Sequence, residues 1–312
     1  MVTYPQPIGF SDLLGWDDED YAEILSIFQS QTDLTIADLF TAARKVSPSR
    51  ARAFFQSNFQ PLRFGPAFAG HITGYYEPVL PARAAPDAEY KFPLHAAPKD
   101  MPEIWATRAE IETGKLLSGQ GLELVYLNSQ IDQYFCHIQG SVAVTYPDGE
   151  TRRFGFSAKN GHSYHSIGAE LVAMGEIGAK QITADWVKDW LRHHPDQVDA
   201  LLQRNPSYIF FEPRNENGAV GAARQVLTAN RSIAIDPAYI PYGLPVMVVG
   251  ETRAARIYFA QDCGSAIKGA QRADIFCGTG DAAGRIAGAI NEPASLTVLW
   301  PKGHDLPHRW AG

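Results

Sequence analysis

Two stretches near the N-terminus place apolar residues at the spacing of an amphipathic helix. Between Asp17 and Phe28 the apolar side chains fall three and four residues apart, at Tyr21, Ile24, Leu25 and Phe28. This spacing puts them on one face of a helix. Residues 36–46 repeat the pattern, so we expect two helices within the first 60 residues.

After Pro61 the pattern changes to short segments rich in β-branched and aromatic residues. We predict strands at residues 69–76, 134–138 and 142–146. The Pro-Asp-Gly turn that follows the last of these predicts a β-hairpin with residues 153–157. The Pro- and Ala-rich residues 78–98 are predicted to form a linker or a long connection.

Helices return in the middle of the chain, and strands follow them. Thr107 and Glu110 form a capping-box pattern, which marks a helix start. Two more helices are expected at residues 167–174 and 183–193. Strands are then expected at residues 209–211, 232–235, 246–249, 256–260 and 296–299. The order of elements predicts a mainly β protein, antiparallel or barrel-like, with helices at its start and middle.

Composition excludes several classes of protein. Hydrophobic residues make up 45% of the 312 residues, enough for one large domain or two ordinary ones. The 27 basic and 34 acidic residues give a formal charge of −7, and no Lys/Arg run is present. Because nucleic-acid binders carry basic clusters, we expect no nucleic-acid partner. No apolar run approaches the ~20 residues needed to span a membrane.

The N-terminal residues lack the basic and apolar regions of a signal peptide. We therefore expect either a cytoplasmic protein or a chain that begins after a removed signal. Composition does not decide between the two.

The cysteines and histidines show no metal-binding pattern. Cys136, Cys263 and Cys277 include no CxxC pair, and no HExxH or paired-histidine spacing occurs. A 263–277 disulfide is conceivable, but three buried thiols are favoured. We expect no metal and no cofactor.

Two aspartates stand out in the segment from Phe259 to Gly278. Asp262 ends an apolar strand, and Asp274 lies among Ala273, Ile275 and Phe276. Apolar surroundings favour the neutral form of a carboxyl group and raise its pKa, as a general acid for a glycosidic oxygen requires. The alternative is that both aspartates cap turns beside the neighbouring glycines.

Two other segments carry side chains suited to sugars. Tyr75 and Tyr76 lie on opposite faces of a predicted strand, so one would face the core and the other a groove; the alternative, favoured on the residues alone, is that both rings fill the core. Glu77 is a third carboxylate. Gln139 could bind sugar hydroxyl or acetamido groups. His137 is interpreted as a strand histidine with its hydrogen bonds satisfied.

Two glycine-rich segments resemble nucleotide-binding loops without matching them. Residues 278–284 have one residue too many for GxGxxG and no surrounding βαβ unit, and residues 264–268 lack the Gly-Lys-Ser/Thr ending of a phosphate loop. Nucleotide binding is not expected.

Taken in order, five motifs resemble one family. They are TGYYEP at 73–78, IQGS at 138–141, NPSYIFF at 205–211, RSIAIDPAYIPYGLPV at 231–246 and DCGSAIKGAQRADIFCGTG at 262–280. This pattern is similar to that of the membrane-bound lytic murein transglycosylase A family, over residues 65–300. The last part resembles its three-aspartate domain, with Asp236, Asp262 and Asp274 as the three aspartates.

The resemblance implies a mainly β fold with peripheral helices. A double-psi β-barrel domain would comprise residues 1–80 and 205–312, and a smaller inserted β domain residues 81–204, with a glycan-binding groove between the two. Asp274 matches the catalytic aspartate. The supporting or substrate-binding residues would be Asp262, Tyr75, Thr73, Gln139, Ser141, Lys268 and Asp236.

The resemblance also implies the reaction. The enzyme would cleave the β-1,4 bond between N-acetylmuramic acid and N-acetylglucosamine, leaving 1,6-anhydromuramyl ends, with Asp274 as acid and then base. Its partner would be peptidoglycan glycan strands in the periplasm, near the outer membrane. A glycosidase pairing Asp274 with Asp262 or Glu77 and a noncatalytic, expansin-like glycan-binding protein are the alternatives.

Overall fold

The computed structural model describes residues 4–31, 36–179, 181–307 and 310, and the chain divides into two compact units. Unit 1 comprises residues 1–75, 220–278 and 290–312. Unit 2 comprises residues 76–219 and 279–289. The domain limits expected from the sequence, at residues 80/81 and 204/205, stay predictions. No described helix combines the length and apolar character that crossing a bilayer requires.

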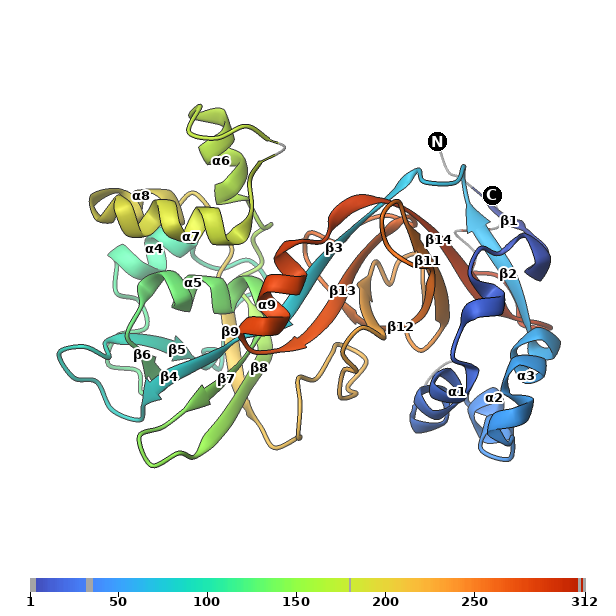
Figure 1. Cartoon of the computed structure of the whole chain (residues 1–312). Helices are drawn as coiled ribbons and strands as arrows, with labels where there is room; N and C mark the ends of the chain where they lie inside the picture. Colours follow the sequence, from blue (N-terminus) through green and yellow to red (C-terminus); the bar gives the residue numbers. More distant parts are fainter. Residues whose placement is uncertain (1–3, 32–35, 180, 308–309, 311–312) are drawn as a thin grey trace. The chain divides into compact units, whose positions relative to one another are not determined.

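Unit 1 is built on a sheet that closes on itself (Figure 1). Its strands are β1 (Pro5–Pro7), β2 (Phe59–Phe64), β3 (Gly70–Glu77), β10 (Ser232–Ile235), β11 (Pro245–Gly250), β12 (Arg256–Cys263), β13 (Arg272–Thr279) and β14 (Asn291–Pro301). In the described chain the order is β1-β2-β14-β11-β12-β10-β13-β3, and an additional β14–β3 pairing closes six of these strands into a barrel. Strands β10 and β12 run parallel, whereas β11 is antiparallel to both β12 and β14. The predicted barrel is confirmed.

Three helices pack together in unit 1 (Figure 1): α1 (Tyr21–Ser30), α2 (Ala37–Ala43) and α3 (Ala51–Asn58). Phe28, from the predicted apolar face of α1, is fully buried against Phe40 and Phe259. The first two helices confirm the prediction, although α1 begins later than expected. The Asp20 side chain caps it by accepting a hydrogen bond from the Glu23 amide at 3.1 Å.

Unit 2 contains a second sheet covered by helices. Its strands, in the order β5-β6-β4-β7-β8-β9, are β4 (Val79–Arg83), β5 (Phe92–His95), β6 (Glu123–Leu127), β7 (Ser141–Thr145), β8 (Thr151–Lys159) and β9 (Ile209–Arg214). Its helices are α4 (Arg108–Thr113), α5 (Gln130–Gln139), α6 (Ile167–Ala173), α7 (Ala184–His193), α8 (Val198–Leu202) and α9 (Asp281–Gly288). The β7–β8 hairpin and the Thr107 capping box are as predicted.

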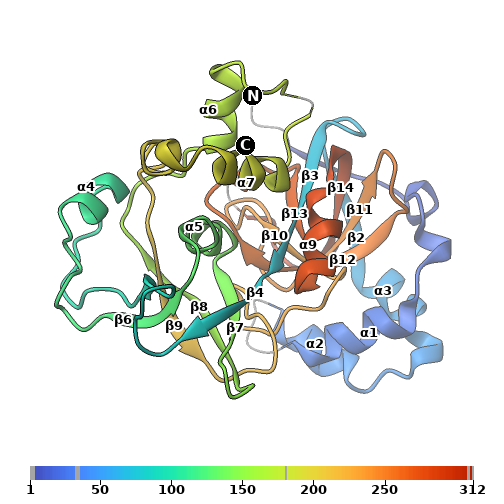
Figure 2. The ribbon, with the colours of Figure 1, turned by 60° about the vertical axis from the view of Figure 1, so that its left-hand side comes forward.

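Two predictions for unit 2 were wrong. Residues 78–98 are more than a connection, because they hold strands β4 and β5. Residues 134–138, predicted as a strand, lie in helix α5, which packs against β5, β6 and β7 (Figure 2). Ser129 caps the start of α5 by accepting from the Asp132 amide, and Gly140, at φ +75°, ends it.

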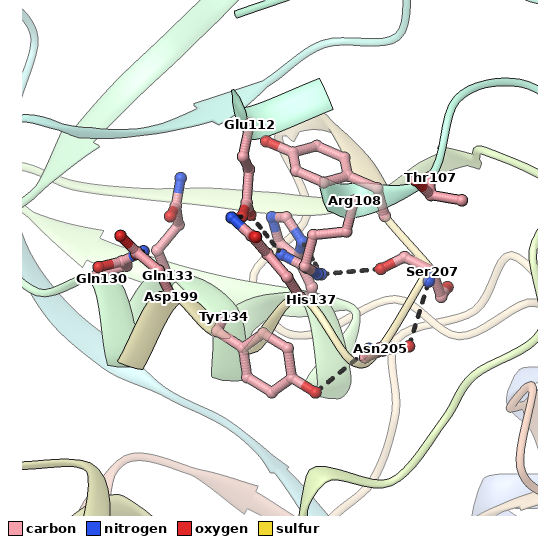
Figure 3. A network of polar contacts seen from close by, with 12 residues as sticks. Thr107, Arg108, Glu112, Gln130, Gln133, Tyr134, His137, Asp199, Asn205 and Ser207 are labelled. Carbon is pink, nitrogen blue, oxygen red and sulfur yellow. Dashed lines mark hydrogen bonds and ion pairs between the residues drawn. The ribbon is translucent and has the colours of Figure 1, made fainter. Parts of the chain in front are cut away.

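A buried polar network joins α4, α5 and the chain before β9 (Figure 3). Arg108, which is 1% exposed, pairs with Glu112 and donates to the Ser207 carbonyl oxygen at 2.9 Å. One of its nitrogens lies 2.9 Å from His137 Nδ1. His137 is a buried residue of helix α5, not a strand residue as predicted. Burial together with the Arg108 charge holds its pKa well below the usual value.

Candidate active site

Asp262 and Asp274 lie in one row across three neighbouring strands of the barrel. Ala234 on β10 is paired with Asp262 on β12 and with Asp274 on β13. Directly paired residues point to the same face of a sheet, so both carboxylates flank the small Ala234 side chain. A register shift between Ile233 and Ala234 skips Gln261 and thereby brings Asp262 into the row.

Asp274 is half-buried and receives one hydrogen bond from the described residues. Thr73 Oγ1, on β3, donates to Asp274 Oδ1 at 2.6 Å. The other oxygen, Oδ2, has no hydrogen-bond partner among the described residues. Burial raises the pKa of Asp274 to about 6, although the Thr73 hydrogen bond and the Arg272 charge oppose the change. This carboxyl group can hold a proton near neutral pH and present it to a ligand.

Asp262 is held differently. Tyr75 Oη donates to its Oδ2 at 2.7 Å, and the Ala222 and Cys263 amides each donate to its Oδ1 at 2.9 Å. Burial raises the pKa of Asp262, while these three donors act against the change by favouring the carboxylate. Burial also raises the pKa of Tyr75 well above its usual value, which keeps the phenol a donor. Asp262 is thus a fixed acceptor with both oxygens occupied.

The third aspartate holds a loop in place. Asp236 is buried at the end of β10, and its two oxygens accept hydrogen bonds from the Ala238 amide at 3.1 Å and the Gly269 amide at 2.8 Å. Gly269 has φ +99°, a conformation that favours glycine. Lys268, the neighbouring residue, is exposed. Asp236 therefore anchors the loop that presents Lys268.

The remaining predicted residues belong to unit 2. Gln139, the last residue of α5, accepts a hydrogen bond from the Tyr76 amide through Oε1 at 3.1 Å. Ser141 opens β7 opposite Gly155. Glu77 is buried, where it pairs with Arg153 at 3.3 Å and accepts from Thr279 Oγ1 at 2.9 Å. These contacts give Glu77 a structural role within unit 2.

The cysteines form no disulfide. Cys136 and Cys277 are buried as expected, but Cys263 is exposed, which corrects the prediction of three buried thiols. Within the described residues, no three His, Cys, Asp or Glu side chains gather closely enough to hold a metal ion.

Arg272 is a site residue that the sequence reasoning missed. It lies two positions before Asp274 on β13, and its Nη2 donates to Thr73 Oγ1 at 2.7 Å. Residues two apart on a strand share a face, so this spacing would have been a usable signal, but no strand was predicted over residues 272–279.

Two domain families match this chain. The MltA specific insert domain matches residues 71–212, and the 3D domain matches residues 231–300. Membrane-bound lytic murein transglycosylase A of Escherichia coli strain K12 is 33% identical over 240 residues, which are 73% of this chain and 65% of that protein. The chain therefore matches less than two thirds of the length of this curated relative.

Solved structures match more completely. A membrane-bound lytic murein transglycosylase from Agrobacterium tumefaciens is similar with a TM-score of 0.86 and 30% identity, covering 96% of this chain and 98% of that one. Escherichia coli MltA with bound chitohexaose is similar with a TM-score of 0.73 and 28% identity, covering 97% and 92%. With both domain models and these relatives in agreement, the chain belongs to the membrane-bound lytic murein transglycosylase A family.

Proposed function

We propose that this chain is a lytic transglycosylase that cleaves peptidoglycan glycan strands, with Asp274 as its single catalytic acid and base. The observation that carries the proposal is the contrast between the two aspartates. Asp274 has a pKa raised to about 6 and one oxygen without a hydrogen-bond donor among the described residues, whereas Asp262 has both oxygens occupied by donors. The names of the relatives support this choice of substrate, and one of them was solved with bound chitohexaose.

The reaction needs one proton and no water. Protonated Asp274 gives its proton to the oxygen that links N-acetylmuramic acid to N-acetylglucosamine, and the bond from that oxygen to C1 breaks with its electron pair on the oxygen. The C6 hydroxyl of the same muramyl residue attacks C1. Asp274, now a carboxylate, takes the C6 hydroxyl proton, so a 1,6-anhydro ring forms and the enzyme returns to its starting state.

The other residues would support this step. Asp262, fixed by Tyr75, supplies a negative charge near the sugar cation that develops as the bond breaks. Gln139, Ser141 and Lys268 would contact the glycan. None of these steps calls for a metal or cofactor.

The main alternative is hydrolysis by a carboxylate pair. It would need Asp262 or Glu77 to activate water or act as nucleophile. The donors on Asp262 and the ion pair of Glu77 disfavour both assignments.

Mass spectrometry of purified glycan strands after incubation tests the function. We expect 1,6-anhydromuramyl ends, one water lighter than reducing ends. Reducing ends would indicate a hydrolase, and binding without cleavage would indicate a glycan-binding protein.

We also propose that the native protein works in the periplasm, associated with the outer membrane. The support is that its relatives are named membrane-bound. Fractionation of the source cells tests this, and recovery from the cytosol would contradict it.

A further inference from the structure

We propose that Arg272 is a positioning residue that acts through the Thr73 hydroxyl to hold the transferable proton of Asp274 on Oδ2. The inference rests on the proposed function, in which Asp274 is the acid. Arg272 lies outside the set of residues predicted from the sequence. The inference also assigns different roles to the two oxygens of Asp274: Oδ1 accepts from Thr73, and Oδ2 carries the transferable proton.

The three side chains form a continuous chain of hydrogen bonds. Arg272 Nη2 donates to Thr73 Oγ1 at 2.7 Å, and Thr73 Oγ1 donates to Asp274 Oδ1 at 2.6 Å. The guanidinium is itself fixed, because Nη1 donates to the carbonyl oxygens of Ala273 and His71. Arg272 therefore reaches Thr73 from an anchored position.

The donor and acceptor in each of these hydrogen bonds follow from the chemistry of the three side chains. A guanidinium has donors and no acceptor, so the Thr73 oxygen must accept from Arg272. One lone pair of the hydroxyl is then occupied, and the neighbouring positive charge polarises its O–H bond. Thr73 becomes a better donor and a poorer acceptor, so Asp274 Oδ1 accepts and the acidic proton resides on Oδ2.

Oδ2 is the oxygen to which no described residue donates a hydrogen bond. The three hydrogen-bonded side chains therefore place the proton on the oxygen that has no protein partner among the described residues and so remains available to a ligand. Without Arg272 the Thr73 hydroxyl could accept from a proton on Oδ1, where it would face the protein rather than the substrate.

A direct effect of the Arg272 charge is the competing explanation. Arg272 lowers the pKa of Asp274 by its charge as well, and Asp262 raises it. The other titratable groups that interact with Asp274 are Tyr75 and Cys277. A charge effect needs no Thr73, so removing Thr73 separates the two explanations.

The experiment uses Arg272→Gln, Thr73→Val and the double variant, with the full chain and purified glycan strands. Arg272→Gln should lower kcat about 10-fold to 100-fold with little change in KM, because misplacing a reacting group costs rates of this order. The same change should move the basic limb of the pH profile to higher pH, since Arg272 lowers the pKa of Asp274. In the Thr73→Val background, Arg272→Gln should have much less effect on kcat.

Conservative and control variants complete the set. Thr73→Ser keeps the hydroxyl and should keep most of kcat. Arg253→Gln removes another partly exposed arginine of unit 1, paired with Glu292 at 3.1 Å, and should leave both kcat and the pH profile unchanged. Thermal unfolding of each variant identifies those that fail to fold. Arg272→Lys keeps the positive charge but loses the two guanidinium NH₂ groups, so it should still lower kcat.

Two outcomes overturn the inference. One is an unchanged kcat in Arg272→Gln. The other is that Arg272→Gln lowers kcat equally in the wild-type and Thr73→Val backgrounds, which would mean that Arg272 acts on Asp274 through its charge alone. A carboxyl ¹³C titration of Asp274 in each variant needs no activity. If the wild type releases no anhydro product, the proposed function fails, while this titration still shows whether Thr73 transmits the effect of Arg272.

Discussion

Replacing Asp274 with asparagine should abolish cleavage and at the same time stabilise the protein at neutral pH. Asparagine keeps the size of the side chain, and its oxygen can still accept from Thr73. Its amide nitrogen would occupy the place of Oδ2, which has no donor facing it among the described residues. The variant therefore removes the proton and the half-buried charge without breaking the hydrogen bond from Thr73.

The magnitude follows from the pKa of Asp274, which rises from 3.8 to about 6 on folding. A carboxyl group with a raised pKa favours folding below its unfolded pKa, and this stability is lost as pH rises through the folded pKa. The full difference corresponds to about 3 kcal/mol, and partial contact with solvent reduces the expected effect to about 1–3 kcal/mol. Asp274→Asn should be more stable than the wild type by this amount at pH 7.5 and equal to it at pH 3.5.

Catalysis should change in the opposite direction. In the proposed mechanism Asp274 serves as both acid and base, so the loss should reach or exceed the upper end of the ~10²–10⁴-fold typical of general acid–base catalysis. Glycan binding should persist, because the amide resembles the protonated acid. In the wild type, kcat/KM should fall as pH rises above about 6.

Denaturant unfolding at the two pH values, with release of anhydro ends measured in parallel, tests both effects. The exposed Asp305→Asn in the same unit controls for the loss of one negative charge. A variant that is less stable at pH 7.5 would show that burial does not raise the pKa of Asp274. Near-normal release of anhydro ends would refute its role as the acid.

Three further predictions concern other parts of the chain. Asp262→Asn should reduce kcat less than Asp274→Asn, because a supporting charge tunes the site without transferring the proton; the reverse order in steady-state assays would exchange their roles. Chelation with EDTA should leave cleavage unchanged, and loss of activity restored by one divalent ion would contradict this. Arg231→Met should destabilise the protein by about 3–5 kcal/mol in denaturant unfolding, because it leaves Glu19, 2.9 Å from Arg231, as a buried unpaired charge; a loss below 1 kcal/mol would contradict this.

Where local signals dominate, the sequence was sufficient to predict the structure. The helical spacing of Ile24, Leu25 and Phe28, the capping box at Thr107 and the Pro-Asp-Gly turn each depend on residues close together in the chain. Helix α5 had such a signal too. Ile131, Tyr134, Phe135 and Ile138 pack in one cluster at helical spacing, but the aromatic and β-branched residues of the segment were given more weight than its period.

The site was predictable only in part, for a physical reason. Apolar neighbours marked Asp274 as a carboxyl group with a raised pKa, and its pKa is raised by burial. The contact between Arg272 and Thr73 joins residues 199 positions apart, and the cap that Ala222 places on Asp262 comes from a loop 40 positions away. Their pairing depends on strand register, which local composition does not encode.

The closure of the barrel by β14 has a consequence for how the protein folds. This last strand pairs with β2, β3 and β11, and the hydrogen bond between Thr73 and Asp274 spans 201 residues. Pairings this distant in sequence make folding slow, because the entropy of loop closure is lost before the contacts form. During synthesis the barrel cannot close until residues 291–301 are available, so a nascent or C-terminally truncated chain should have no competent acid.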